Sequence, residues 1–231
     1  MTTLTVPSPF ASPRGDKPLS PQTVSIVWRI ADALDERRTP ANVPNAVWLE
    51  LATTTLRGKG ARSDNVWLRE CLQRLTGLQL SGEYRGDPWG AVLLAEWQIV
   101  EGGAKVRLLI PPAGIQALRL PATFVKIEEM AAVQLPGHAR RLYGLLADRK
   151  RQTRKSWTYS LEELRFALGV EQHKSYDRFN NFRQRVLEPA VKAINDFGTV
   201  EVKMLPKKVG RSVDRVEFSW DWKSVDAAKE T

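Results

Sequence analysis

Apolar residues recur along the chain at two spacings, which alternate from one segment to the next. Over residues 20–37 they return every three or four positions, which predicts an amphipathic helix capped by Ser20. A short helix over residues 47–51 and a longer helix that ends at Gly77 are predicted on the same ground. Residues 95–110 instead alternate apolar with polar side chains on each side of a Gly-Gly turn, which predicts a β-hairpin with one apolar face.

The second half of the chain repeats this order. A helix over residues 137–150 precedes a short strand, and Ser160 with Glu163 forms the sequence pattern of a capping box, which begins a second helix. A long helix is predicted over residues 175–197 with its cap at the first of these positions, a serine. A second one-faced hairpin follows over residues 200–220.

Helix, short helix, capped helix and hairpin, found twice, is the plan of the winged-helix fold, in which the third helix can enter a major groove while the hairpin lies along the DNA backbone. The predicted fold class is therefore α+β, with two winged-helix domains in tandem over residues 21–120 and 121–222. Residues 1–20 are rich in Pro, Gly, Ser and Thr and are expected to form a flexible arm, and residues 223–231 a tail.

Composition excludes several classes of protein. The chain has 231 residues, of which 42% are hydrophobic and 26% charged, as in a globular protein. One cysteine and two histidines supply neither an internal disulfide nor a four-ligand zinc site, so no metal and no cofactor are expected. The sequence has no signal peptide and no run of about 18 apolar residues, which predicts a cytoplasmic protein with no membrane contact.

The positive charge is concentrated in the second half. The chain carries a formal net charge of +9. Residues 1–135 contribute +2 and residues 136–220 contribute +8, whereas the last residues are slightly acidic. This asymmetry predicts a polyanionic partner, and nucleic acid is favoured over a membrane surface because no basic amphipathic helix stands apart from the fold.

One face of the predicted helix over residues 175–197 is apolar, and the opposite face collects groups that can bind base edges. Arginine can bind guanine through O6 and N7, and asparagine or glutamine can bind adenine through N6 and N7. We expect Arg178, Asn181 and Arg185 to contact bases. The other candidates on this face are Lys174, Gln184 and Lys192. A merely solvated face is the alternative, which the winged-helix context disfavours.

Two residues of this helix have competing explanations. Arg183 falls inside the apolar arc, so its guanidinium either pairs with a carboxylate or contacts a phosphate. Pro189 removes the N–H that would bond the carbonyl of Arg185, which predicts a bend. The bend fits either the curvature of a groove or the wrapping of the helix around the core.

Two further basic clusters are candidates for phosphate contacts. Lys207, Lys208 and Arg211 lie at the predicted tip of the second hairpin, from which long side chains can reach the DNA backbone. Arg154 and Lys155 follow the first helix of this half, where cations also stabilise the negative end of the helix dipole.

Catalytic constellations are missing from the sequence. His138 and His173 are too isolated for the metal site of strand-nicking replication enzymes, and the Gly-Lys-Gly of residues 58–60 lacks the spacing of a phosphate-binding loop. The adjacent Glu128 and Glu129 are explained better by helix-start electrostatics than by acid/base chemistry. The protein is therefore not expected to be an enzyme.

Several spaced motifs occur in order in the second half. They are Arg141-Leu-Tyr-Gly-Leu-Leu146, Ser160-Leu-Glu-Glu-Leu-Arg165, Phe179-x-x-Phe182-Arg-x-Arg185-Val-Leu-Glu-Pro-Ala-Val191-x-x-Ile194-Asn195, Lys208-x-Gly-Arg211 and Val216-x-Phe218. Their order resembles the second winged helix of the iteron-binding plasmid replication initiators over residues 136–220. The first half is similar to that family only in architecture.

The resemblance implies a plasmid DNA replication initiator that binds direct repeats, called iterons, at the origin through its C-terminal winged helix. The implied role of the N-terminal domain is dimerisation with auxiliary DNA contact, and the dimer would repress the initiator's own gene. The implied partners are origin DNA, a host replication initiator and the replicative helicase, in the cytoplasm of a bacterial host. The implied initiator helps to open the origin and contributes no catalysis.

Two other functions compete with this interpretation. A winged-helix transcriptional repressor with no initiation role binds DNA equally well, so only a plasmid-maintenance assay separates it from an initiator. A nicking or polymerising enzyme needs a cluster of metal-binding acids or histidines, and the sequence shows none.

Overall fold

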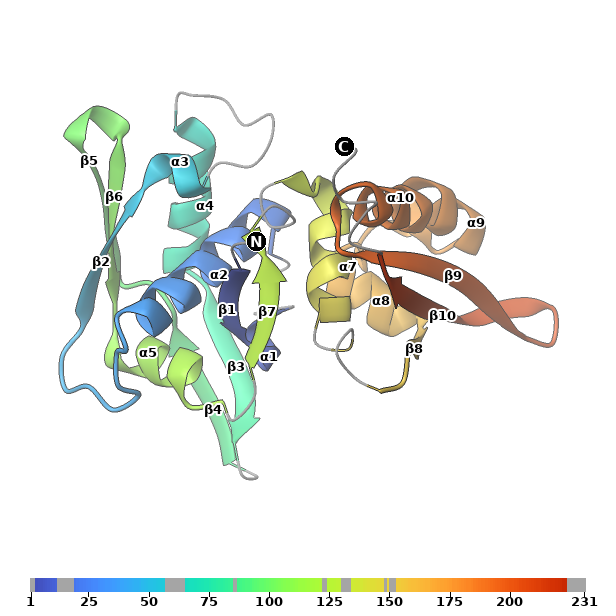
Figure 1. The fold of residues 1–231 in the computed structure, drawn as a ribbon, viewed down its shortest axis with the longest axis horizontal. Coiled ribbons are helices and arrows are strands. Elements are labelled where there is room, and N and C mark those ends of the chain that lie inside the picture. Colours follow the sequence, from blue (N-terminus) through green and yellow to red (C-terminus); the bar gives the residue numbers. More distant parts are fainter. Residues whose placement is uncertain are drawn as a thin grey trace. The chain divides into compact units, whose positions relative to one another are not determined.

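The computed structural model describes residues 3–11, 19–56, 65–84, 87–121, 124–129, 134–147, 149 and 153–223. The chain forms two compact units, residues 3–126 and the residues from 127 onward. Both units combine helices with antiparallel sheets, so the α+β class predicted from the sequence is confirmed (Figure 1). Within the described ranges, every helix is too short or too polar to cross a membrane. The predicted tail lies outside these ranges apart from Lys223.

The N-terminal unit contains a three-stranded sheet and two smaller ones. Its elements are β1 (Thr3–Pro7), α1 (Ser8–Ala11), α2 (Pro21–Glu36), β2 (Val47–Ala52), α3 (Thr53–Leu56), α4 (Val66–Thr76), β3 (Gln79–Tyr84), β4 (Asp87–Val92), β5 (Glu96–Val100), a 3₁₀ turn (Glu101–Gly103), β6 (Lys105–Ile110) and α5 (Pro112–Arg119), followed by β7 (Phe124–Glu128). The strand orders are β2-β6-β5, β3-β4 and β1-β7. The β5–β6 hairpin lies where the apolar alternation predicts it.

Two predictions for this half are wrong. Residues 47–51 are not a helix but belong to β2, which pairs with β6 so that Trp48 lies opposite Leu109, and the short helix follows as α3. Residues 3–11 are not a flexible arm but form β1 and α1. Leu4 and Val6 are buried, and the indole N–H of Trp28 donates to the carbonyl of Phe10 at 3.0 Å. In both cases partners distant in sequence supply the hydrogen bonds.

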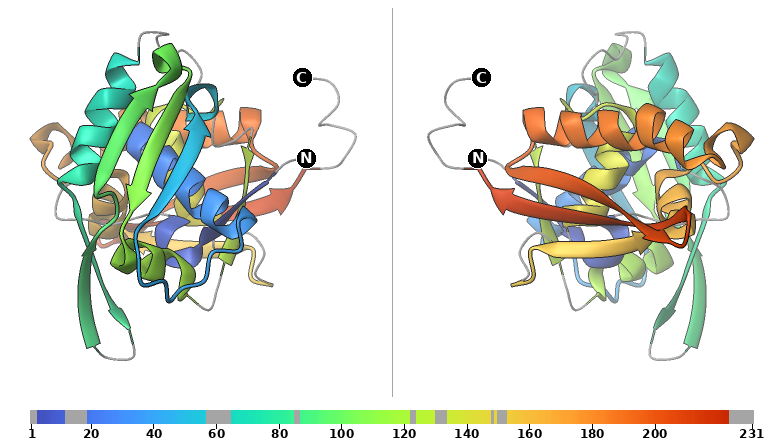
Figure 2. Two further views of the ribbon diagram at one scale, coloured as in Figure 1. Left: turned by 90° about the vertical axis from the view of Figure 1, so that its left-hand side faces the viewer. Right: turned by 90° about the vertical axis from the view of Figure 1, so that its right-hand side faces the viewer.

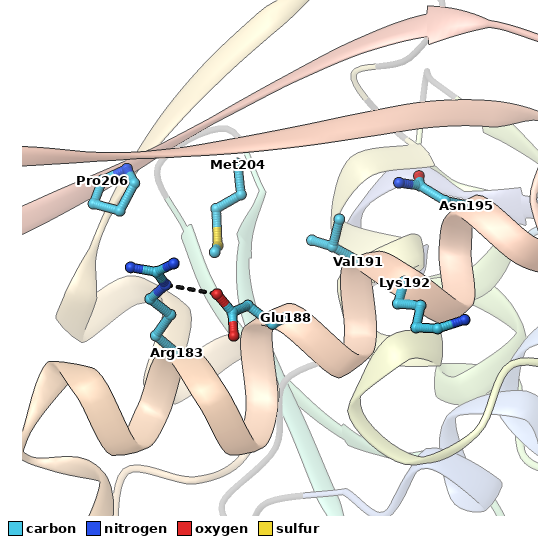
Figure 3. Close-up of a pocket in the computed structure, with 7 residues that line it drawn as sticks. All are labelled: Arg183, Glu188, Val191, Lys192, Asn195, Met204 and Pro206. Carbon is cyan, nitrogen blue, oxygen red and sulfur yellow. Dashed lines mark hydrogen bonds and ion pairs between the residues drawn. The ribbon is translucent and has the colours of Figure 1, made fainter.

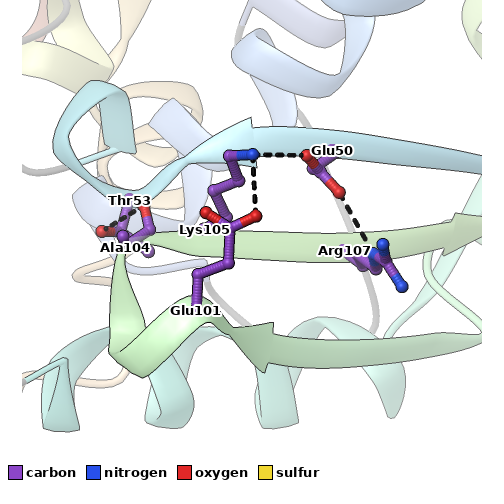
Figure 4. A network of polar contacts seen from close by, with 6 residues as sticks. All are labelled: Glu50, Thr53, Glu101, Ala104, Lys105 and Arg107. Carbon is purple, nitrogen blue, oxygen red and sulfur yellow. Dashed lines mark hydrogen bonds and ion pairs between the residues drawn. The ribbon is translucent and has the colours of Figure 1, made fainter.

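Polar contacts tie the β5–β6 hairpin to β2 and to the start of α3 (Figure 4). The buried Thr53 bonds the carbonyl of Ala104 through its backbone N–H at 2.9 Å and its hydroxyl at 3.1 Å. On the exposed face, Lys105 and Arg107 each lie 3.1 Å from Glu50, and they lower the pKa of that carboxyl, Lys105 more strongly. Exposed ion pairs contribute little to stability, so the Thr53 bonds are the firmer link.

The C-terminal unit repeats the same topology. Its elements are α7 (Gly137–Ala147), β8 (Ser156–Ser160), α8 (Leu161–Leu168), a 3₁₀ turn (Lys174–Tyr176), α9 (Phe179–Phe182), a π turn (Arg183–Leu187), α10 (Glu188–Phe197), β9 (Val200–Val209) and β10 (Ser212–Trp222). The sheet order β8-β10-β9 matches β2-β6-β5 of the first unit, because in each the strand between the helices pairs with the second strand of the hairpin. The β3–β4 hairpin is an insertion in the first unit.

The helix-start prediction for the adjacent Glu128 and Glu129 holds only for Glu129, which is helical. Glu128 itself lies outside that helix. It is the last residue of β7 and is buried, where its carboxylate accepts hydrogen bonds from the hydroxyls of Tyr143 and, at 3.2 Å, of Thr199. These bonds compensate for the burial of the carboxylate. Glu128 therefore joins the end of β7 to α7 and to the residue before β9.

His138 should make the stability of the C-terminal unit depend on pH. Burial lowers the pKa of its imidazole, whose Nδ1 lies 3.3 Å from the carbonyl of Leu168. The imidazole of His138 binds a proton near pH 6.5 in the unfolded chain but only at a lower pH in the folded unit. The contribution of the neutral imidazole to stability is therefore complete above about pH 6.5 and is lost as the pH falls from there through the folded pKa. Between about pH 7.5 and about pH 5, urea unfolding should show a smaller fall in unfolding free energy for His138→Gln than for the wild type. Identical pH profiles would contradict this.

Candidate nucleic-acid interface

Helix α8 holds the loop that leads into the third helix. The predicted capping box is confirmed: the Ser160 hydroxyl accepts from the N–H of Glu163 at 3.1 Å, and the Glu163 carboxylate accepts from the N–H of Ser160 at 2.7 Å. Further along α8, the guanidinium of Arg165 donates to the carbonyls of Tyr176 at 3.1 Å and of Asp177 at 3.0 Å. The sequence motif contains Arg165, but nothing in the spacing reveals this role.

Replacing Arg165 with alanine should release this loop. Two hydrogen bonds from a half-exposed charged donor are lost, so we expect the free energy of unfolding to fall by about 1–3 kcal/mol. Arg165→Lys should recover only part of the loss, because an ammonium lacks the planar fork that reaches both carbonyls. Urea unfolding measures both variants, and wild-type stability in Arg165→Ala would show that the loop does not depend on this residue.

The third helix begins later than the sequence predicts. It starts at Phe179, with Arg178 at the N-cap position, whereas Ser175 lies in a separate 3₁₀ turn and caps nothing. The carbonyl of Ser175 accepts a hydrogen bond from the amide of Asn181 at 3.0 Å. The apolar face is as predicted, since Phe182, Val186, Leu187, Ala190, Ala193 and Ile194 are buried.

The candidate base-reading side chains differ in how free they are. Arg178, Gln184 and Arg185 are exposed, and their side chains make no hydrogen bond or ion pair with any residue that the structure describes. Asn181 is half-buried and its amide nitrogen is engaged. Lys174 is exposed, and the exposed Lys192 pairs with Asp196 at 2.8 Å.

Arg183 lies beside a groove between α10 and β9 (Figure 3). Its Nε bonds Glu188 Oε1 at 2.7 Å, so the carboxylate pairing foreseen for it is present. The side chain is 46% exposed and therefore does not belong to the buried face. The groove measures about 430 Å³ and is lined by Arg183, Glu188, Val191, Lys192, Asn195, Met204 and Pro206.

The hairpin is longer and its tip shorter than the sequence predicts. Lys207 and Lys208 lie on strand β9, and only Gly210 and Arg211 form the turn, with Gly210 in the left-handed region at φ 62°. Lys207 pairs with Glu217 at 2.7 Å across the sheet, which lowers the pKa of that carboxyl. Lys208 and Arg211 are exposed.

Arg154 and Lys155 precede β8, at the sheet edge opposite to β9. Both are exposed, and each guanidinium or ammonium lies over an indole, Arg154 at 5.8 Å from the ring centre of Trp157 and Lys155 at 5.7 Å from that of Trp222. Cation–π contacts of this kind stabilise the edge of the sheet. The structure therefore does not bring these residues to the helix face.

The third helix and the hairpin do lie side by side in the C-terminal unit (Figures 1 and 2). The helix presents the exposed Arg178 and Arg185. Beside it, the hairpin carries Lys208 on strand β9 and Arg211 in its turn. Within the described residues, no group of histidine, cysteine and acidic side chains could hold a metal ion. Such an arrangement can bind a polyanion.

Comparison with known proteins places this geometry in context. Residues 160–220 match the sequence model of the family described as initiator Rep protein, WH2. The fold is similar to that in the crystal structure of Pi initiator protein in complex with iteron DNA, with a TM-score of 0.68 and 13% sequence identity over 96% of this chain and 98% of that chain. No curated protein sequence matches the chain. The resemblance carried by the sequence motifs and the winged-helix fold class are confirmed.

Proposed function

We propose that this chain, whose residues 160–220 are the second winged-helix domain of an initiator Rep protein, initiates plasmid DNA replication by binding direct repeats at the origin. The observation that carries the proposal is the third helix of that domain, which presents Arg178, Gln184 and Arg185 exposed above a buried apolar face and unpaired with any described residue. Free donors on a rigid helix are what reading of base edges requires.

The helix and the hairpin have different tasks in this proposal. The helix lies in the major groove, where Arg178 and Arg185 contact bases. The hairpin lies along the backbone, where Lys208 and Arg211 contact phosphates without reading sequence. Arg183 and Lys192 each already have a carboxylate partner, so a phosphate must compete for them. Lys207 likewise pairs with a carboxylate, that of Glu217, with which a phosphate must compete.

The N-terminal unit contributes dimerisation and auxiliary DNA contact. Its helix α4 holds the same place in the topology as the third helix of the second unit, and its exposed residues Arg69, Gln73 and Arg74 can donate to DNA. The dimer represses the initiator's own gene. The monomer on the repeats helps to open the origin with a host replication initiator and recruits the replicative helicase, without catalysis of its own.

A plasmid-maintenance assay combined with DNA binding tests this function. The gene with its flanking DNA should sustain a replicon in a bacterial host, and the protein should bind tandem repeats from that DNA, with a slope of log K against log salt of about −0.9 per phosphate contacted. Repression without replicon maintenance would instead identify a transcriptional repressor. Magnesium-dependent cleavage of origin DNA by the purified protein would identify an enzyme.

A further inference from the structure

The third helix is interrupted by the π turn at Arg183–Leu187. There the N–H of Glu188 bonds the carbonyl of Arg183, five residues earlier. The carbonyl of Gln184 could accept from position 188 in an α-helix or from position 189 in a π-helix. The N–H of Glu188 is instead directed to the carbonyl of Arg183, and Pro189 has no N–H to donate. Among the residues that the structure describes, the carbonyl oxygen of Gln184 therefore receives neither its α-helical nor its π-helical donor.

Three features of the sequence keep the π turn in place. Pro189 disfavours a continuous α-helix because its ring clashes with the carbonyl four residues earlier. The ion pair between Arg183 and Glu188, at 2.7 Å, joins residues that would point about 140° apart on an α-helix. Val186 and Leu187 are buried and anchor the turn to the core. The open carbonyl is thus a fixed feature of this helix and not a frayed end.

The open carbonyl belongs to the outer side of the helix. Gln184, Arg185 and Pro189, which surround it along the helix, are all exposed, whereas the buried residues of the turn face the core. It lies on the face that carries the exposed Arg178 and Arg185. Arginine side chains only donate hydrogen bonds, so on this face acceptors come from the side-chain amides of Asn181 and Gln184 and from this carbonyl, which is the one held by the backbone.

We infer that the carbonyl oxygen of Gln184 reads a base by accepting a hydrogen bond from an exocyclic amine in the major groove. The inference rests on the proposed function, in which this face enters that groove. Cytosine N4 and adenine N6 are the amines displayed there, while guanine displays only acceptors that suit the arginines. π turns recur at functional sites, and here the turn adds a backbone acceptor beside the donating arginines.

Pro189→Ala tests this because it closes the Gln184 carbonyl in either register: in a π turn the new N–H of position 189 bonds it, and in a restored α-helix the N–H of Glu188 does. Alanine is a good helix former, so the variant should fold, and circular dichroism checks this. We expect its affinity for the origin repeat to fall about fivefold, as for the loss of one hydrogen bond, with affinity for an unrelated duplex unchanged. Repeats in which single cytosines or adenines are replaced by analogues without the amine locate the contact. At one position, the analogue should lower the affinity of the wild type about fivefold and leave the affinity of Pro189→Ala unchanged.

Gln184→Ala is the matched control, because it removes the side chain and keeps the carbonyl. It should remain sensitive to the same analogue. The analogue scan on the wild type stands even if Pro189→Ala does not fold: if no amine position costs affinity, or if the sensitivity disappears in Gln184→Ala, the carbonyl is not the acceptor. A protein with no preference for any duplex would instead refute the proposed function, which is a separate result.

Discussion

Replacing Arg178 and Arg185 together with alanine is expected to abolish the preference of the protein for origin repeats over unrelated DNA. Both side chains are exposed and uncommitted to other described residues. A bidentate arginine contact with guanine discriminates by about 1–3 kcal/mol, and contacts at separate base pairs add approximately. The double variant should therefore lose at least about 30-fold in specificity, measured by fluorescence anisotropy with repeat and shuffled duplexes as competitors.

Arg37→Ala combined with Arg107→Ala is the charge-matched control. Both arginines are exposed and belong to the N-terminal unit outside helix α4: Arg37 follows α2 and donates to the carbonyl of Trp48 at 2.8 Å, and Arg107 lies on β6 and pairs with Glu50. This control removes the same charge, so it should weaken all DNA binding slightly and leave the ratio between repeat and shuffled duplexes unchanged. If the Arg178 and Arg185 variant keeps its full specificity, the assignment of the recognition helix is wrong.

Phe182→Ala is expected to give the largest loss of stability in the site. Phe182 has no exposed surface and packs between the 3₁₀ turn and the core: its ring lies 6.4 Å from that of Tyr176, and the guanidinium of Arg165 lies 5.5 Å from its centre. Truncation of a fully buried phenylalanine costs about 3–5 kcal/mol, through lost burial and the cavity left behind. Urea unfolding of the full chain should show this loss in the transition of the C-terminal unit.

Phe179→Ala distinguishes burial from general loss of an aromatic ring. Phe179 lies on the same helix, one turn earlier, and is only half-buried. Its truncation should destabilise the unit by clearly less than Phe182→Ala. Equal effects would mean that the helix start, rather than the buried ring, anchors the site.

Most candidate residues of the site could be found from the sequence because they depend on helical periodicity. The apolar stripe of the third helix places Phe182 and Ile194 inside and Arg178 and Arg185 outside, and the structure agrees. The contacts of these residues could not be found in the same way. That Asn181 is tied to Ser175 depends on a loop geometry that residue spacing does not specify.

The capping box at Ser160 and the β5–β6 and β9–β10 hairpins follow from the chain alone, because contacts between residues three or four positions apart, or across a tight turn, decide them. Tertiary structure decided the rest. Residues 47–52 become a strand because β6, more than 50 positions later, offers its free edge. Residues 3–7 do so because β7 pairs with them. The third helix starts at Phe179 where the guanidinium of Arg165 holds the preceding loop, a contact that exists only after α8 has packed beside it.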